Sequence, residues 1–194
     1  REKVLGPEHP DTLMDRYDVA GALAGQSKYV EAESEYRAVL AIRSRVLGPE
    51  HPHTLMTRNA LGLVLSGQGR YAEAEAEDRK VLQVRERVLG PKDPDTLRAR
   101  GSVASALFGQ HKYSEAGAEF CAVLQIRERV LGRYDRDTLN SAYMVALCLA
   151  QQNKFEEAQE YARWAMEGLR KVLGPDQPQT KHAEGLYERV NTKR

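Results

Sequence analysis

A Leu-Gly dipeptide recurs along the chain at one fixed interval. Its five copies are 42 residues apart and begin at Leu5, Leu47, Leu89, Leu131 and Leu173. A period of this size indicates a helical solenoid or a β-propeller, because both repeat one small unit in tandem. A propeller blade needs several short strands separated by turns. Each unit here instead has one loop rich in proline and glycine, and its long segments are rich in the helix formers Ala, Leu, Glu and Arg. The repeat therefore predicts an all-α fold.

Two breaks divide each unit into a helical hairpin. The linker at 47–54 holds a glycine suited to a left-handed cap and prolines that cannot continue a helix. After each linker a threonine is predicted to cap the next helix with its hydroxyl, at Thr12, Thr54, Thr96, Thr138 and Thr180. The second break is a short polar turn, such as 67–70. We expect an antiparallel pair of helices of about 14 and about 18 residues.

The spacing of apolar residues predicts which helix faces pack. Each first helix carries a small residue, at Ala20, Gly62, Ala104 and Ala146. Each second helix opens with an aromatic residue and has an alanine one turn later, as in Tyr29 and Ala32. The apolar stripe is predicted to cover the whole second helix, ending at Val46, Val88, Val130 and Val172.

This arrangement resembles the tetratricopeptide repeat (TPR) family, whose motif combines that small residue, the aromatic residue and the alanine. The small residue and the alanine are twelve residues apart in all four units. The unit is longer than the usual repeat of about 34 residues, as in the variant found in kinesin light chains, nephrocystin-3-like proteins and sensor arms of STAND-type regulators. Armadillo and HEAT units lack the aromatic and alanine pair. The resemblance implies a right-handed α-solenoid of tandem TPR hairpins with a C-terminal capping helix.

We predict one continuous solenoid domain with four repeats. The repeats are placed at 12–47, 54–89, 96–131 and 138–173, and the capping helix at 180–194. In that helix Ala183, Leu186 and Val190 form a narrow apolar stripe, whereas Glu188 stands where a repeat would have a small apolar residue. Residues 1–6 are interpreted as the tail of a preceding truncated repeat, so that the chain is expected to come from a longer array.

The side of the first helices that packing does not use is the predicted functional surface. In TPR arrays this side lines the concave groove, and the resemblance implies that a peptide or protein partner binds there. An alternative is that several of these residues are buried between adjacent first helices. Kinesin light chain repeats commonly carry asparagines on this face, and only Asn59 matches that pattern. The candidates for partner binding are Met14, Tyr17, Asp18, Met56, Asn59, Leu63, Arg98, Ser102, Phe108, Asn140, Tyr143 and Met144.

Charged residues recur with the same period. Arginines near the ends of second helices suit the negative end of the helix dipole. Stacking is predicted to align them along one edge, as Arg43, Arg45, Arg85, Arg87, Arg127 and Arg129, with Arg16, Arg58 and Arg100. This edge is either a ridge for an acidic partner or a solvated row balanced by glutamates. Asp78 departs from the pattern, since Tyr36 and Phe120 stand at its position in neighbouring units, and it predicts a weaker interface or a polar contact.

Composition and motifs argue against several other functions. The chain has 29 basic and 28 acidic residues, whereas nucleic-acid-binding surfaces carry a basic excess. No apolar run approaches the ~20 residues that a bilayer span needs. Cys121 and Cys148 lack the close pairing of zinc ligands and are expected to be reduced. His51 and His53 lie in a linker whose sister copies lack a second histidine, so no metal site is predicted.

These observations predict a non-catalytic scaffold for protein interactions that needs no cofactor. The expected setting is the cytoplasm, as the TPR sensor or docking arm of a larger regulatory protein. The alternatives are a cargo or assembly adaptor like kinesin light chains, and an accessory arm of an enzyme whose catalytic domain lies elsewhere. The expected partner is a protein or peptide rather than nucleic acid or a membrane, and self-association stays open.

Overall fold

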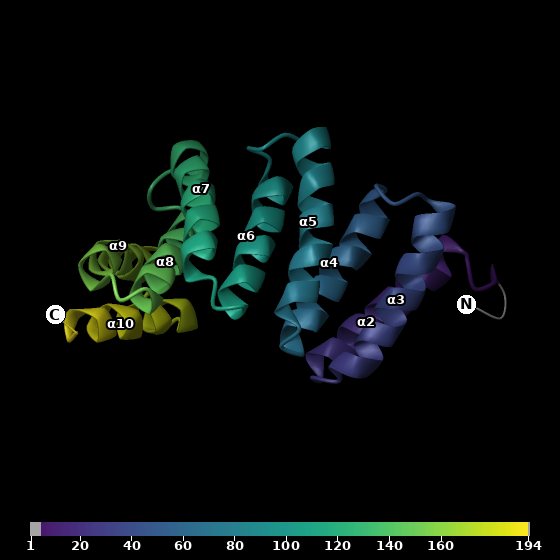
Figure 1. Ribbon diagram of the computed structural model, residues 1–194, viewed down its shortest axis with the longest axis horizontal. Helices are drawn as coiled ribbons and strands as arrows, with labels where there is room; N and C mark the ends of the chain where they lie inside the picture. The colour runs from purple at the N-terminus through teal and green to yellow at the C-terminus, as the bar shows by residue number, and fades with distance from the viewer. Residues whose placement is uncertain (1–4, 194) are drawn as a thin grey trace. The chain divides into compact units, whose positions relative to one another are not determined.

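The computed structural model describes residues 5–193, and that part of the chain is helical, with short turns and no strand (Figure 1). The all-α prediction is confirmed. Of the predicted truncated repeat, residues 1–4 lie outside the described residues. The helices are α2 (Pro10–Gly25), α3 (Tyr29–Val46), α4 (Pro52–Gly67), α5 (Tyr71–Val88), α6 (Pro94–Gly109), α7 (Tyr113–Leu131), α8 (Arg136–Gln151), α9 (Phe155–Leu173) and α10 (Pro178–Asn191).

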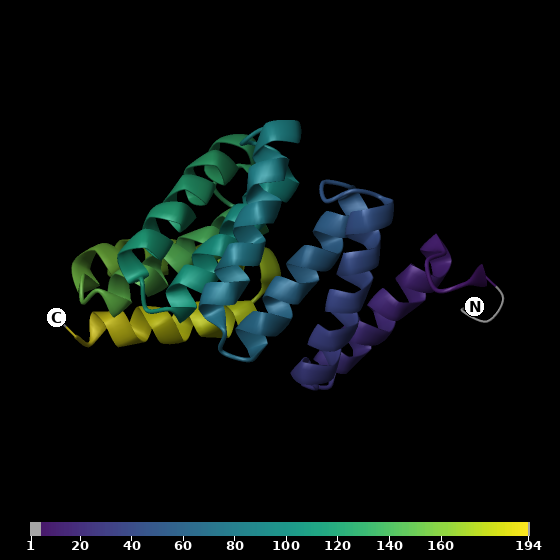
Figure 2. The same cartoon turned by 45° about the vertical axis from the view of Figure 1, so that its right-hand side comes forward.

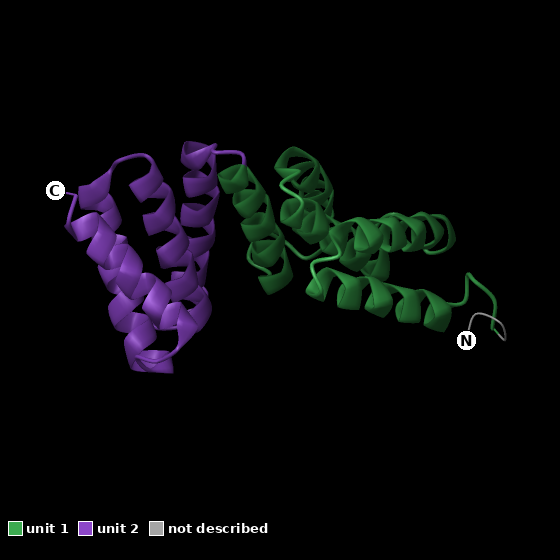
Figure 3. Ribbon diagram, turned by 90° about the horizontal axis from the view of Figure 1, so that it is seen from below, with its two compact units in different colours: residues 1–109 green, residues 110–194 purple. Residues whose placement is uncertain are grey.

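Within each compact unit of the chain, a helix packs mainly against its neighbours in sequence. This order is visible for α2 to α5 and for α8 to α10 when Figure 1 is compared with the turned view in Figure 2. The chain divides into two compact units, residues 1–109 with α2 to α6 and residues 110–194 with α7 to α10 (Figure 3). In the first unit α4 also contacts α2 and α6, and in the second α10 contacts both α8 and α9. Such consecutive packing is typical of a TPR solenoid, as predicted; the repeat boundaries remain a prediction.

The first helices begin earlier than the sequence analysis placed them, and the predicted threonine caps are wrong. Proline or arginine occupies the first helical position, and the residue before it is the cap. The Nδ1 atoms of His9 and His51 accept the backbone N–H two residues further on at 3.2 Å, and Asp135 accepts from Asp137 at 2.8 Å. Proline favours this early start because its φ is already helical.

The threonines have instead become part of the interior. Thr12, Thr54, Thr96 and Thr138 have buried hydroxyl oxygens without a hydrogen-bond partner in the described part of the chain, and Thr180 donates to the carbonyl of Gly174. The linker glycines have the positive φ that was predicted, but Gly132 and Gly174 have ψ of 163° and so do not adopt the left-handed helical cap. Gly6, Gly48, Gly90, Gly132 and Gly174 all have φ between 87° and 95°, a region that favours glycine.

The small, aromatic and alanine positions form the core between helices. Ala20, Ala32, Ala74 and Ala116 are fully buried. The aromatic residue of one hairpin packs on the last residue of a later first helix. A Cβ atom added at Gly67 would lie 2.8 Å from the Tyr29 ring, and one at Gly109 would lie 2.3 Å from the Tyr71 ring. These glycines therefore allow the close packing of successive repeats within the first unit.

The apolar stripe of the second helices ends sooner than predicted. Val46, Val88, Val130 and Val172 remain about half exposed rather than buried. At Val46 the reason is visible, because the linker and the start of α2 leave a hollow of about 190 Å³ beside it. The last turn of the second helix is thus only partly covered.

Candidate partner-binding surface

All twelve candidate residues lie on first helices and none of them is buried. Asp18, Leu63 and Arg98 are exposed, and the other nine are half-buried. Nine belong to the first unit, on α2, α4 and α6, and three to the second unit, on α8. The alternative of burial applies in part, because Tyr17 and Tyr143 pack against the core and the Oδ1 atom of Asn59 is buried. The candidate residues form accessible rows within each unit.

On α2 the row rests on a layer of aromatic and cationic side chains. The rings of Tyr17 and Tyr36 meet edge to face with their centroids 5.2 Å apart. The guanidinium carbon of Arg43 lies 5.5 Å from the Tyr17 ring centroid, and its Nη2 atom lies 3.9 Å from the Met14 sulfur. Burial raises the pKa of Tyr36 to about 12 and also raises the pKa of Tyr17. Both phenols therefore stay neutral, and Tyr17 is held with one side accessible.

Arg43 is not on a solvated edge, which corrects the interpretation of its sequence position. Only 2% of it is exposed, and burial lowers the pKa of its guanidinium. It donates to the His53 carbonyl at 3.2 Å and to the Thr57 hydroxyl at 2.7 Å. A buried cation needs such acceptors to offset its desolvation. Arg43 thus joins the end of α3 to the start of α4.

The same junction recurs in later repeats. Arg85 donates to the Asp95 carbonyl at 3.0 Å, joining α5 to α6. Arg127 donates to the Asp137 carbonyl at 3.2 Å and to the Ser141 hydroxyl at 2.9 Å, joining α7 to α8. These arginines therefore stabilise contacts between repeats, a role that neither interpretation of the edge included.

Most of the other arginines of the predicted edge are paired within the chain. The Nη2 atom of Arg16 lies 2.9 Å from the Oε2 atom of Glu35. Further ion pairs join Arg45 to Glu8, Arg87 to Glu50, Arg58 to Glu77 and Arg100 to Glu86. The row is therefore largely neutralised, which favours the second interpretation of that edge.

Asp78 lies inside the first unit without the polar contact that could have compensated for it. It is 3% exposed, and its Oδ1 atom accepts no hydrogen bond from the described residues. That oxygen would be 2.6 Å from a Cβ atom at Gly62, so the glycine makes room for the carboxyl group. Burial raises the pKa of Asp78 to about 7, and the charge of Glu77 contributes. At neutral pH the interface therefore holds a partly ionised carboxyl group.

The family of the chain follows from the repeat itself. A sequence profile for the tetratricopeptide repeat matches residues 14–76, 60–118 and 102–171, which overlap and cover most of the chain. The chain belongs to the tetratricopeptide repeat family. None of the curated proteins matches it.

Solved structures share this TPR fold. A protein of Podosopora anserina described as a kinesin light chain with nearly identical TPR-like repeats is 21% identical, with a TM-score of 0.81 over 95% of this chain and 88% of that one. BtubC (BKLC) from P. vanneervenii is 15% identical, with a TM-score of 0.73 over 95% and 80%. A Rap protein in complex with the competence and sporulation factor is 13% identical, with a TM-score of 0.68 over 99% and 59%. At these identities the likeness concerns the fold.

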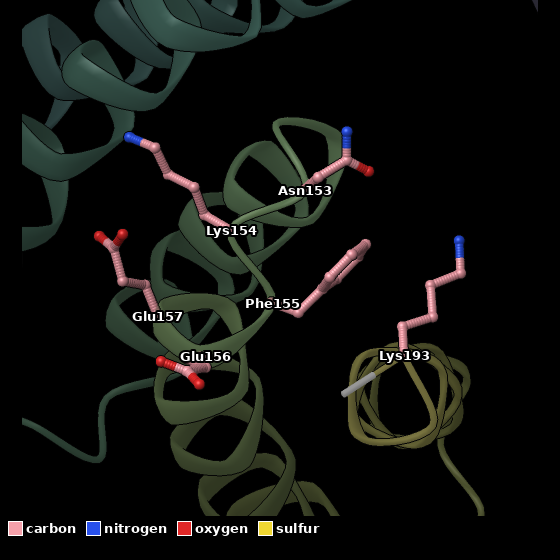
Figure 4. A pocket seen from close by; sticks show the side chains of 6 residues that line it. All are labelled: Asn153, Lys154, Phe155, Glu156, Glu157 and Lys193. Atoms are coloured by element: carbon pink, nitrogen blue, oxygen red, sulfur yellow. The ribbon is translucent and has the colours of Figure 1, made fainter.

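One hollow of the second unit does not bring reactive groups together. It measures about 700 Å³ and is lined by Asn153, Lys154, Phe155, Glu156, Glu157 and Lys193. The Lys193 nitrogen lies 5.4 Å from the centroid of the Phe155 ring. Figure 4 shows this ring turned toward α10, while Lys154 and Glu157 point to the other side of α9. These side chains diverge, so they do not form a nucleophile and base pair.

Thiols and potential metal ligands are the other reactive side chains of the TPR chain. Cys121 and Cys148 are free, and burial raises the pKa of Cys148 to about 12 and that of Cys121 as well, so both stay protonated. Among residues 5–193 no three His, Cys, Asp or Glu side chains are grouped to hold a metal ion. No helix in this range has the length and apolar character of a membrane span.

A second hollow, of about 480 Å³, is one that the sequence analysis missed. It lies between α9 and the linker that precedes α8, and its lining includes Arg133, Tyr134, Arg163, Trp164 and Lys171. The signal in the sequence was the departure of this linker from the repeat, because Arg133 and Tyr134 replace the proline and charged residue of the sister TPR linkers.

Proposed function

We propose that this TPR chain is a non-catalytic scaffold that binds a peptide or protein partner on the accessible face of its first helices. The observation that carries this proposal is the row of accessible side chains on α2, α4 and α6. Leu63, an aliphatic residue on α4, is 66% exposed, with the half-buried Met56 and Asn59 on the same helix. An exposed apolar side chain beside an adaptable methionine suits a protein ligand. The Rap protein solved with the competence and sporulation factor is a TPR-like example of a complex.

In this proposal the chain is the sensor or docking arm of a larger regulatory protein in the cytoplasm, of the STAND type. A second candidate is a cargo or assembly adaptor. The likeness to the kinesin light chain repeats of Podosopora anserina favours it. The two roles share the same binding face and differ in what precedes the repeats in the full protein, namely a nucleotide-binding domain or a coiled coil.

The test compares two arginine substitutions at equally exposed aliphatic residues. Leu63→Arg lies on the proposed face, and Val30→Arg, on α3 and 71% exposed, lies on a second helix. Neither side chain is buried, so both variants should fold. We expect affinity capture from cell extract to lose specific partners with Leu63→Arg and to keep them with Val30→Arg. Equal recovery by both variants would reject the first-helix face as the binding surface.

A further inference from the structure

The fourth repeat differs from the other three around the 480 Å³ hollow between α9 and the linker before α8. At the position of Trp164 the first three repeats have Ala38, Lys80 and Ala122. At the position of Gly168 they have Ile42, Val84 and Ile126. The linker residues Arg133 and Tyr134 replace Pro7-Glu8, Pro49-Glu50 and Pro91-Lys92. A large aromatic wall, a glycine one turn further along α9 and an aromatic linker thus occur together in this repeat.

The walls of the hollow are fixed by direct contacts. The Trp164 Nε1 atom donates to the Arg133 carbonyl at 3.2 Å, and the Arg133 guanidinium carbon lies 4.1 Å from the Trp164 ring centroid. The Lys171 nitrogen lies 4.8 Å from the Tyr134 ring centroid. Linker and helix therefore hold two aromatic rings with cations beside them, and all these residues belong to the second unit.

Two cations at this hollow lack the carboxylate that their counterparts have in the first two repeats. Lys171 corresponds to Arg45 and Arg87, which form ion pairs with the linker residues Glu8 and Glu50. In the fourth repeat Tyr134 stands at that linker position, so the ammonium group meets an aromatic ring instead.

Arg163 also lacks the carboxylate that pairs with its counterparts. Its counterparts Arg37 and Arg79 pair with Glu33 and Glu75, four residues earlier, at 2.8 and 2.7 Å. The residue four before Arg163 is Gln159, which is buried and donates to Asn191 at 2.7 Å. In the described chain neither Lys171 nor Arg163 has an ion-pair partner.

We propose that this hollow binds one aspartate or glutamate side chain of a protein partner. Lys171 and Arg163 donate to its carboxylate, and the Trp164 ring packs against its aliphatic stem. The first two repeats show that a carboxylate suits these cation positions, because the chain supplies its own there. A carboxylate also binds an ammonium group more strongly than an exposed aromatic ring does. Glu160 and Glu167, which also line the hollow, favour a single acid over a dense acidic run.

This contact is independent of the surface proposed above, because it uses none of the twelve first-helix candidates. Trp164 is the only tryptophan of the chain, so its indole N–H gives one identifiable NMR resonance at the site. The full chain is titrated at low salt with acetyl-Ala-Ala-Glu-Ala-Ala-amide and with the same peptide carrying glutamine. We expect a saturable shift of the indole resonance with the glutamate peptide and an affinity about tenfold or more weaker for the glutamine peptide.

Substitutions separate the two cations from general charge effects. Lys171→Gln and Arg163→Gln should each weaken binding of the glutamate peptide by about 3-fold or more. Arg87→Gln, which removes an equivalent but already paired cation, should leave it unchanged. Arg163 is exposed and serves as the second variant, in case Lys171→Gln disturbs the linker. Equal affinity for both peptides, no saturable shift, or unchanged binding by both α9 variants would overturn the proposal.

Discussion

The buried carboxyl group of Asp78 should make the stability of the first unit depend on pH in a direction opposite to that of most aspartates. In the folded chain its pKa is about 7, against an ordinary value of 3.8. The folded state therefore holds the proton more tightly than the unfolded state does. The resulting stabilisation is complete at low pH and is lost as the pH rises through 7, because the carboxylate must then ionise without a hydrogen-bonding partner at Oδ1.

The magnitude follows from the difference between the two pKa values. One pKa unit corresponds to about 1.4 kcal/mol, and linkage then gives a loss of about 2–3 kcal/mol between roughly pH 5 and pH 8. Asp78→Asn keeps the size of the side chain and removes its titration. The measurement is urea unfolding followed by circular dichroism at several pH values, for the parent chain and for this variant.

The quantity to compare is the difference between the two pH profiles, since other titrating groups are common to both. Hydrogen exchange of the amides in α4 and α5 locates the effect at the interface. Asp78→Phe, which copies Phe120 of the third repeat, should remove the same pH dependence and raise stability at pH 8. Parallel profiles for the parent and Asp78→Asn would refute the reasoning, because they would mean that this carboxyl group does not change its pKa on folding.

Three further substitutions test the packing and the turns, each by its effect on the free energy of unfolding in urea. Gly109→Ala should destabilise by about 1–3 kcal/mol because its Cβ atom meets the Tyr71 ring, whereas Gly25→Ala, at the equivalent but open position, should not; similar costs would contradict the packing argument. Arg43→Gln should lower the free energy of unfolding by about 1.5–3 kcal/mol because charged hydrogen bonds are lost. A cost no larger than that of Arg45→Gln, at an exposed arginine, would contradict a structural role for Arg43. Ser27→Gly should stabilise by about 0.5–1 kcal/mol because Ser27 has φ of 60°, and a loss of stability would show that this φ carries no strain.

The repeat alone was enough to predict the helices, their order and much of their packing. Successive copies of one amphipathic pattern leave little choice of fold, and Ala20 and Ala32 are buried as their spacing required. The residue at which each first helix begins was harder to predict. The threonine caps failed because proline and the preceding histidine or aspartate provide an earlier start for the same helix.

The burial of side chains that contact a neighbouring repeat was also hard to predict from the sequence. Arg43 and Arg45 are two residues apart near the end of a helix, and their sequence context is similar, yet one is buried and the other is exposed. What separates them is the position of the His53 carbonyl and the Thr57 hydroxyl in the next repeat. The Trp164 hollow was missed for the same reason, because its cations are recognised as unpaired only when the partners of their counterparts are known.

The arginine junctions differ in their acceptors from one repeat to the next. Arg43 donates to the Thr57 hydroxyl and Arg127 to the Ser141 hydroxyl, whereas Ala99 stands at the matching place for Arg85, which donates to the Asp95 carbonyl. A backbone carbonyl accepts at all three junctions, and it does not depend on the side chain that the following repeat carries. A repeat that ends in this arginine can therefore be followed by another copy without a matched hydroxyl, so that gene duplication or engineering can lengthen the array one repeat at a time.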